Sequence, residues 1–192
     1  MRNAAPWRSL NRRDDRAAGF AWDEPRPRRQ PGLRVAAAED SAMTVGFIGL
    51  GAMGAAIAGR LLAGGQELIV WNRSPKAADR LAAQPGARRA ASPADALQGE
   101  AAFSMLADDA AVEATLLASG ALDAAAKGLV HVNCATVSVA LAERLEARHR
   151  ELGLAYVAAP VLGRPDAAAA GQLHVLAAGD PARSPRCGRC WN

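Results

Sequence analysis

The sequence predicts an α/β fold with a doubly wound, mostly parallel sheet and helices on both faces. Short, almost continuous apolar runs alternate with alanine-rich runs of helical length between residues 44 and 180. Such runs are typical of parallel strands that are buried on both faces and joined by helical crossovers. With 192 residues, the chain is long enough for one domain with a substantial core. We therefore expect a single folded domain.

The expected elements follow one another in strand–helix order. The strand over residues 44–48 leads into three spaced glycines and then a helix over residues 53–63, which Gly64 and Gly65 can end. The other strands are expected at residues 67–71, 101–106, 129–134, 155–161 and, more weakly, 173–178. The other helices are expected at residues 75–83, 93–97, 109–118 and 139–152.

The helix over residues 139–152 has clear start and stop signals. Ser138 can cap its first turn, and Gly153 can close its end. His149 lies at helical spacing from the leucines of this helix, and we interpret it as a residue at the border of the apolar face rather than a ligand.

The glycines after the first strand indicate a phosphate site. Gly49, Gly51 and Gly54 fit the pattern G-x-G-x-x-G/A between a strand and a helix, which is the context that the dinucleotide-binding fingerprint requires. The first glycine then allows a sharp turn, the second lets backbone approach a pyrophosphate, and the third lets the helix pack closely on the strand. In the alternative interpretation the glycines serve only the turn. The fingerprint favours a Rossmann-type fold with phosphate at a helix N-terminus.

The end of the second strand favours NADP over NAD. Asn72 stands where NAD-binding proteins carry an acidic residue for the ribose, and Arg73 and Ser74 follow it. An arginine can bind a 2′-phosphate through charge-assisted hydrogen bonds, and Lys76 adds attraction at longer range. In the alternative, Arg73 is simply an exposed loop residue.

Four stretches together resemble the β-hydroxyacid dehydrogenases: GFIGLGAMGAAIAGRL, WNRSPKAADRL, SMLADDAAVEATL and APVLGRPDAAAAGQLHVLAAGD. This family includes 3-hydroxyisobutyrate dehydrogenases, glyoxylate and tartronate semialdehyde reductases and imine reductases. Its cofactor domain is similar to that of 6-phosphogluconate dehydrogenase. The resemblance implies hydride transfer between NADP(H) and a small hydroxy acid, semialdehyde or imine. It also implies a second, all-helical domain through which full-length relatives form dimers.

The resemblance implies a set of site residues. Substrate contacts are expected from Thr136, Gly163 and Arg164, although Ala135 stands where a serine is usual and Leu162 and Arg164 replace a serine and a glycine. Arg164 either holds a substrate carboxylate or faces solvent. The cofactor contacts are expected from Gly49, Leu50, Gly51, Ala52, Met53, Gly54, Asn72, Arg73, Ser74, Leu106, Ala107 and Thr136.

No catalytic residue is assigned. The catalytic lysine of the family lies in its helical domain, beyond Asn192, so we expect this chain to be truncated and weak or inactive alone. The alternative is a non-enzymatic nucleotide-binding or regulatory Rossmann module.

The two ends differ in composition from the centre. Residues 1–43 are predicted to be a disordered extension rich in arginine and proline, residues 44–180 the NADP-binding domain, and residues 181–192 an irregular tail. The net charge of +4 comes from these ends, which disfavours nucleic-acid binding, and no apolar stretch suits a membrane span. The pair Cys187 and Cys190 supplies only half of a zinc site, so no metal is expected. With Cys134, the three cysteines do not make a disulfide framework, which favours a reducing, cytoplasmic location. The resemblance to the β-hydroxyacid dehydrogenases implies a small-molecule substrate as the partner.

Overall fold

The computed structural model describes residues 43–179. These residues form a seven-stranded sheet in the order β3-β2-β1-β4-β5-β6-β9, in which β9 alone runs antiparallel. Without its last strand, this is the order of the Rossmann fold. The predicted doubly wound, mostly parallel sheet is confirmed. The predictions for residues 1–42 and 180–192, including Cys187 and Cys190, lie outside the described residues.

The strands agree with the sequence at the centre of the sheet and differ at its edges. The run predicted at residues 155–161 breaks before Pro160. Its last residue, Val161, begins β7, which pairs with β8 in a separate two-stranded sheet. The strands are β1 (Thr44–Ile48), β2 (Glu67–Trp71), β3 (Ala87–Arg89), β4 (Ala101–Ser104), β5 (Val130–Asn133), β6 (Ala155–Ala158), β7 (Val161–Leu162), β8 (His174–Val175) and β9 (Ala178–Gly179).

The helices follow the predicted order with four differences. The run at residues 93–97 forms only a 3₁₀ turn, and the helix after β4 changes to π-helical hydrogen bonding. A 3₁₀ turn before β5 and a short helix after Gly163 were not predicted. The helices are α1 (Ala52–Ala63), α2 (Pro75–Ala82), α3 (Asp109–Val112), α4 (Val139–Glu151) and α5 (Pro165–Ala169), with the turns η1 (Asp95–Leu97), η2 (Glu113–Leu117) and η3 (Leu122–Ala124).

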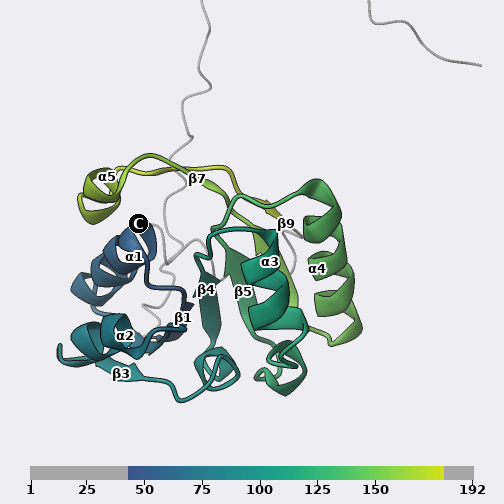
Figure 1. Ribbon diagram of the computed structural model, residues 1–192, viewed down its shortest axis with the longest axis horizontal. Helices are drawn as coiled ribbons and strands as arrows, with labels where there is room; N and C mark the ends of the chain where they lie inside the picture. Colours follow the sequence, from purple (N-terminus) through teal and green to yellow (C-terminus); the bar gives the residue numbers. More distant parts are fainter. Residues whose placement is uncertain (1–42, 180–192) are drawn as a thin grey trace, which may run out of the picture. The chain divides into compact units, whose positions relative to one another are not determined.

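Apolar side chains form a core on each face of the sheet. On the face covered by α1, α2 and α5, Phe47 of β1 stacks on Phe103 of β4, with ring centroids 6.2 Å apart. On the other face, Ile48 and Ile69 pack with residues of η1, η2 and α4. Figure 1 shows α1 and α2 on one side of the strands and α3 and α4 on the other. Both faces are thus buried, as continuous apolar strands predict.

Within residues 43–179, none of the helices has the length and apolar character needed to cross a membrane.

Candidate functional site

The glycine loop lies at the carboxyl edge of the sheet, directly after β1. The chain continues from β1 to its neighbour β2 on one side, whereas β4 lies on the other side of β1, so the strand order reverses here. Gly49 donates its backbone N–H to Trp71 at 2.9 Å, and Met105 donates to Ile48 at 2.8 Å, so the ends of β1, β2 and β4 are held together. In open parallel sheets, this change of direction is where ligands bind.

Two of the three glycines are required by the packing of the loop. Gly49 has φ of +93°, and a Cβ built there would lie 2.3 Å from the carbonyl oxygen of Met105. A Cβ on Gly54 would lie 2.0 Å from the carbonyl oxygen of Gly49. A larger residue at Gly49 would therefore collide with the chain that follows β4, and one at Gly54 would push α1 away from β1.

Gly51 is different, because nothing in the fold requires it. Its φ of −65° is open to any residue, and a Cβ there would meet no atom within 4 Å. The interpretation in which the glycines serve only the turn explains Gly49 and Gly54 but leaves Gly51 unexplained. The space beside Gly51 fits the close approach of a pyrophosphate to backbone.

The start of α1 suits an anion. Gly51 is its N-cap residue, and no acidic residue lies in its first turn. The first intrahelical bond runs from the N–H of Ala55 to the carbonyl oxygen of Gly51, so the backbone N–H groups of Ala52, Met53 and Gly54 have no intrahelical acceptor and point out of the helix. Together with the helix dipole, they provide a partial positive charge for phosphate oxygens.

Asn72 connects the end of β2 to the glycine loop. Its Oδ1 accepts from the backbone N–H of Leu50 at 2.9 Å, and its Nδ2 donates to the carbonyl oxygen of Ser74 at 2.9 Å. The side chain is therefore occupied in holding two loops together. A carboxylate at this position could accept from Leu50 but could not donate to Ser74.

Basic and hydroxyl groups are free beside Asn72. Arg73, Ser74 and Lys76 are exposed, and Ser74 begins α2 without a side-chain capping bond. The nearest carboxylate on α2, that of Asp79, is bound to Arg89 at 2.7 Å. As far as residues 43–179 are concerned, the end of β2 therefore presents unpaired positive charge.

The remaining predicted residues lie at different places along the same edge. Leu106 packs against Gly49, with its Cδ2 3.0 Å from where a Cβ would be, whereas Ala107 is exposed. Gly163 and Arg164 lead into α5, which packs on α1. The Arg164 side chain is 88% exposed, and its Nε lies 3.9 Å from Asp166, so it faces solvent.

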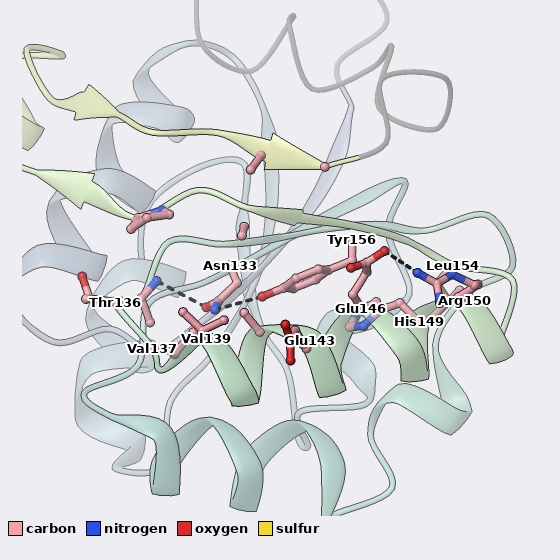
Figure 2. A pocket seen from close by; sticks show the side chains of 16 residues that line it. Asn133, Thr136, Val137, Val139, Glu143, Glu146, His149, Arg150, Leu154 and Tyr156 are labelled. Atoms are coloured by element: carbon pink, nitrogen blue, oxygen red, sulfur yellow. Dashed lines mark hydrogen bonds and ion pairs between the residues drawn. The ribbon is translucent and has the colours of Figure 1, made fainter. Parts of the chain in front are cut away.

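A cavity of about 690 Å³ lies between α4 and the strands β6 and β9. Figure 2 shows Thr136, Glu143 and Tyr156 around it, and Thr136 alone of the predicted site residues lines it. The glycine loop and the end of β2 are not part of its lining.

Five polar side chains are buried in contact with one another at the base of this cavity. They join β4, β5, β6 and α4, and we call them the buried polar cluster: Ser104, His131, Asn133, His149 and Tyr156. Sequence reasoning missed this cluster. The prediction that His149 lies at the border of the core is wrong, because its side chain is 1% exposed.

The two imidazoles of the cluster favour the neutral state. Burial lowers the pKa of His131 well below its usual value, and the charge of His149 lowers it further. Burial also lowers the pKa of His149, although a hydrogen bond to the backbone of Leu145 partly opposes this. Within residues 43–179, no three His, Cys, Asp or Glu side chains gather as metal ligands.

A family model described as the NAD binding domain of 6-phosphogluconate dehydrogenase matches residues 44–190. The chain belongs to this family. It therefore contains a nicotinamide dinucleotide-binding domain, and the arrangement of Gly49, Gly51 and Gly54 fits that cofactor.

The relatives include enzymes of different cofactor use. The NAD-dependent L-serine dehydrogenase of Pseudomonas aeruginosa is 41% identical over 138 residues, which are 71% of this chain and 46% of that protein. A solved structure of Psf3 in complex with NADP+ and 2-OPP is 33% identical, with a TM-score of 0.72, and the match covers 77% of this chain and 52% of the other. The 3-hydroxyisobutyrate dehydrogenase of Mycobacterium tuberculosis, solved with L-serine, is 27% identical, with a TM-score of 0.71. That match covers 79% of this chain and 51% of the dehydrogenase. The chain spans about half the length of the curated relatives it matches.

Proposed function

We propose that residues 43–179 form the NADP(H)-binding domain of an oxidoreductase of the β-hydroxyacid dehydrogenase type. The observation that carries the choice of NADP is the end of β2. There Asn72 is bound to the glycine loop, and the carboxylate of Asp79 on α2 is bound to Arg89. Among residues 43–179, the side chains of Arg73 and Ser74 are exposed and have no partner. A guanidinium and a hydroxyl in this arrangement suit a 2′-phosphate.

The proposed reaction is hydride transfer between the nicotinamide and a small hydroxy acid, semialdehyde or imine, and the cofactor supplies the hydride. The residues of this chain bind and orient it. The start of α1 holds the pyrophosphate, Leu106 and Ala107 lie along the dinucleotide, and Thr136 lies at the nicotinamide end. This substrate class is supported by the relatives, which include an L-serine dehydrogenase, a 3-hydroxyisobutyrate dehydrogenase and an imine reductase from Streptomyces aurantiacus.

We further propose that residues 1–192 by themselves catalyse the reaction slowly. The sequence has only two lysines, Lys76 and Lys127. Lys76 lies on α2 beside the adenosine end, and Lys127 precedes β5 at the opposite edge of the sheet. Neither can act as the general acid at the nicotinamide, and such a group typically contributes 10²- to 10⁴-fold to a rate.

The cofactor proposal is tested at Arg73. Its replacement in Arg73→Ala removes charge-assisted hydrogen bonds, so the affinity for NADPH should fall about ten- to a hundredfold. The affinity for NADH should hardly change, because NADH has no 2′-phosphate. Calorimetric titration with both cofactors measures the two losses, with Arg164→Ala, which removes another exposed arginine, as the matched control. Equal losses for NADPH and NADH would show that Arg73 does not recognise a 2′-phosphate.

A further inference from the structure

The buried polar cluster contains more hydrogen-bond contacts than its neutral side chains can satisfy. Its five members are at most 8% exposed, and none of them belongs to the proposed cofactor contacts. Strand register places the members side by side, since Ser104 pairs with Asn133 and His131 pairs with Tyr156. Asn133 reaches out of the cluster, because its Oδ1 accepts from the backbone N–H of Ala135 at 3.3 Å (Figure 2).

The positions of the hydrogens follow from one fixed acceptor. The Nδ1 of His149 lies 2.6 Å from the carbonyl oxygen of Leu145, which can only accept, so this nitrogen carries a hydrogen. In a neutral His149, Nε2 then accepts, and the Nδ1 of His131, 2.9 Å away, must donate to it. In a neutral His131, Nε2 also accepts, so Ser104 must donate to it across 2.9 Å.

Ser104 cannot serve both of its neighbours at once. Its single hydroxyl hydrogen is also needed by Oδ1 of Asn133, which lies 3.0 Å from Oγ. If Ser104 donates to His131, the oxygens of Ser104 and Asn133 face each other without a hydrogen. If the Asn133 amide turns over, its NH₂ group faces the N–H of Ala135 and releases it. One added proton on the imidazole pair satisfies every contact, since His131 then donates to Ser104 and Ser104 donates to Asn133.

We propose that Asn133 is a positioning residue for the loop at Ala135 and Thr136. The number of protons on the His131–His149 pair decides whether the hydroxyl of Ser104 donates to Asn133 or to His131. Uptake of one proton tightens the hold of Asn133 on Ala135. The proposal rests on the proposed function in one respect, namely that Thr136 lies at the nicotinamide end of the cofactor. The pair thus adjusts the nicotinamide half of the site, while the adenosine half is unaffected.

The surroundings leave the imidazole pair as the titrating group of this region. The ring of Tyr156 on β6 packs at a tilt of 37° against that of His149, with centroids 4.9 Å apart, and burial raises the pKa of the Tyr156 hydroxyl. Ser104 and Asn133 are the polar groups from β4 and β5. The charged groups on α4 and on the elements around it lie at the surface: Glu146 with Arg150, Glu113 with Arg144, Asp123 and Glu151 with Arg148, and Glu143 on the rim of the cavity.

The test compares two probes that share the adenosine half. NADP⁺ carries the nicotinamide, whereas 2′-phospho-ADP-ribose lacks it and keeps the pyrophosphate and the same titrating 2′-phosphate. Calorimetric affinities for the two probes are measured on the full chain from about pH 8 down to the lowest pH at which the chain stays folded, because burial lowers the pKa of both imidazoles below the ordinary histidine range. The ratio of the two affinities should rise roughly three- to tenfold as the pH falls, which is the size of one hydrogen bond.

Two variants separate the cluster from other histidine effects. In Ser104→Ala the ratio should become independent of pH, because the shared hydroxyl is gone. In His174→Gln, which removes the exposed histidine of β8, the pH dependence should persist. A pH-independent ratio in the wild-type chain, or the same pH dependence in Ser104→Ala, would overturn the proposal.

The number and positions of the hydrogens on the ring nitrogens of His131 and His149 are tested without any cofactor by ¹⁵N NMR of the imidazoles. The expected result is His149 with its hydrogen on Nδ1 and one proton taken up by the pair while the chain is still folded. Failure of both probes to bind would overturn the proposed function and leave this second measurement standing. If both rings stay neutral until the chain unfolds, or if His149 carries its hydrogen on Nε2, the proposal is wrong, even where Ser104→Ala does not fold.

Discussion

The glycine loop after β1 and the buried polar cluster beneath α4 both adjoin the carboxyl edge of the sheet, but they are built from different parts of the chain. The loop is built from backbone: Gly49 and Gly54 allow carbonyl groups to approach within distances that no Cβ would permit, and Gly51 leaves open space. The cluster is built from side chains that hydrogen-bond one another and are at most 8% exposed.

The two designs respond to mutation differently. A loop formed by close backbone approach fails when a side chain is added, because backbone cannot move out of the way without shifting the helix. A buried polar cluster fails when a side chain is removed, because its partners are left unsatisfied. The predictions below test this contrast.

The largest effect is expected at Gly54. In Gly54→Val the new side chain would collide with the carbonyl oxygen of Gly49, so thermal or urea unfolding should show a loss of about 3 kcal/mol or more. The matched control is Gly59→Ala in the same helix. A Cβ at Gly59 meets nothing within 4 Å, so this variant should gain up to about 1 kcal/mol from helix propensity. Similar stability of the two variants would contradict the close packing of α1 on β1.

Gly51 should separate binding from folding. In Gly51→Val the fold should keep its stability to within about 1 kcal/mol, because the side chain enters open space. That space is where the pyrophosphate is proposed to lie, so the affinity for NADPH should fall by at least about a hundredfold, which corresponds to roughly 2.7 kcal/mol. Circular dichroism and calorimetry measure the two properties, and normal binding by the variant would mean that the loop is purely structural.

The pH dependence of stability tests the cluster. In the folded state the pKa of both imidazoles is lowered, so above about pH 6.5 both states are neutral and stability is complete. As the pH falls below this value, the unfolded chain binds protons before the folded chain does. Stability should therefore fall by up to about 1.4 kcal/mol per pH unit for each histidine.

His149→Phe isolates one of the two histidines. The ring can still stack on Tyr156, and the pH slope of the unfolding free energy should drop to about half. His174→Gln should leave the slope unchanged, because that side chain is exposed. A wild-type stability that does not change as the pH falls below about 6.5 would rule out buried neutral imidazoles.

The smallest effect is expected at the start of α4, which carries His149. Ser138 accepts from the backbone N–H of Leu141 at 3.2 Å and donates to Asp109, and this bond lowers the pKa of Asp109. Ser138→Ala should cost about 1 kcal/mol in unfolding experiments, the usual effect of losing an N-cap. It should also move the pKa of Asp109 back toward its ordinary value, which NMR titration can follow. No change in either quantity would mean that α4 is held by packing alone.

The sequence determined the features that depend on local chain chemistry. The glycine spacing, the apolar run before it and the helix after it are read from neighbouring residues, and the same holds for the Ser138 cap and for Gly153 as the residue that closes α4. The central strands and their parallel order also follow, because strands buried on both faces must be continuously apolar.

Only the tertiary structure decided what long-range packing controls. Asn72 is 22 residues from Leu50, and no local pattern shows that its side chain holds the glycine loop. His131 and His149 are 18 residues apart and meet because α4 packs on the sheet, so helical spacing alone placed His149 wrongly at the border of the core. The short elements β3 and α5 were missed for a related reason. A few residues carry too little periodicity to be predicted, and such elements exist because the neighbouring strand or helix stabilises them.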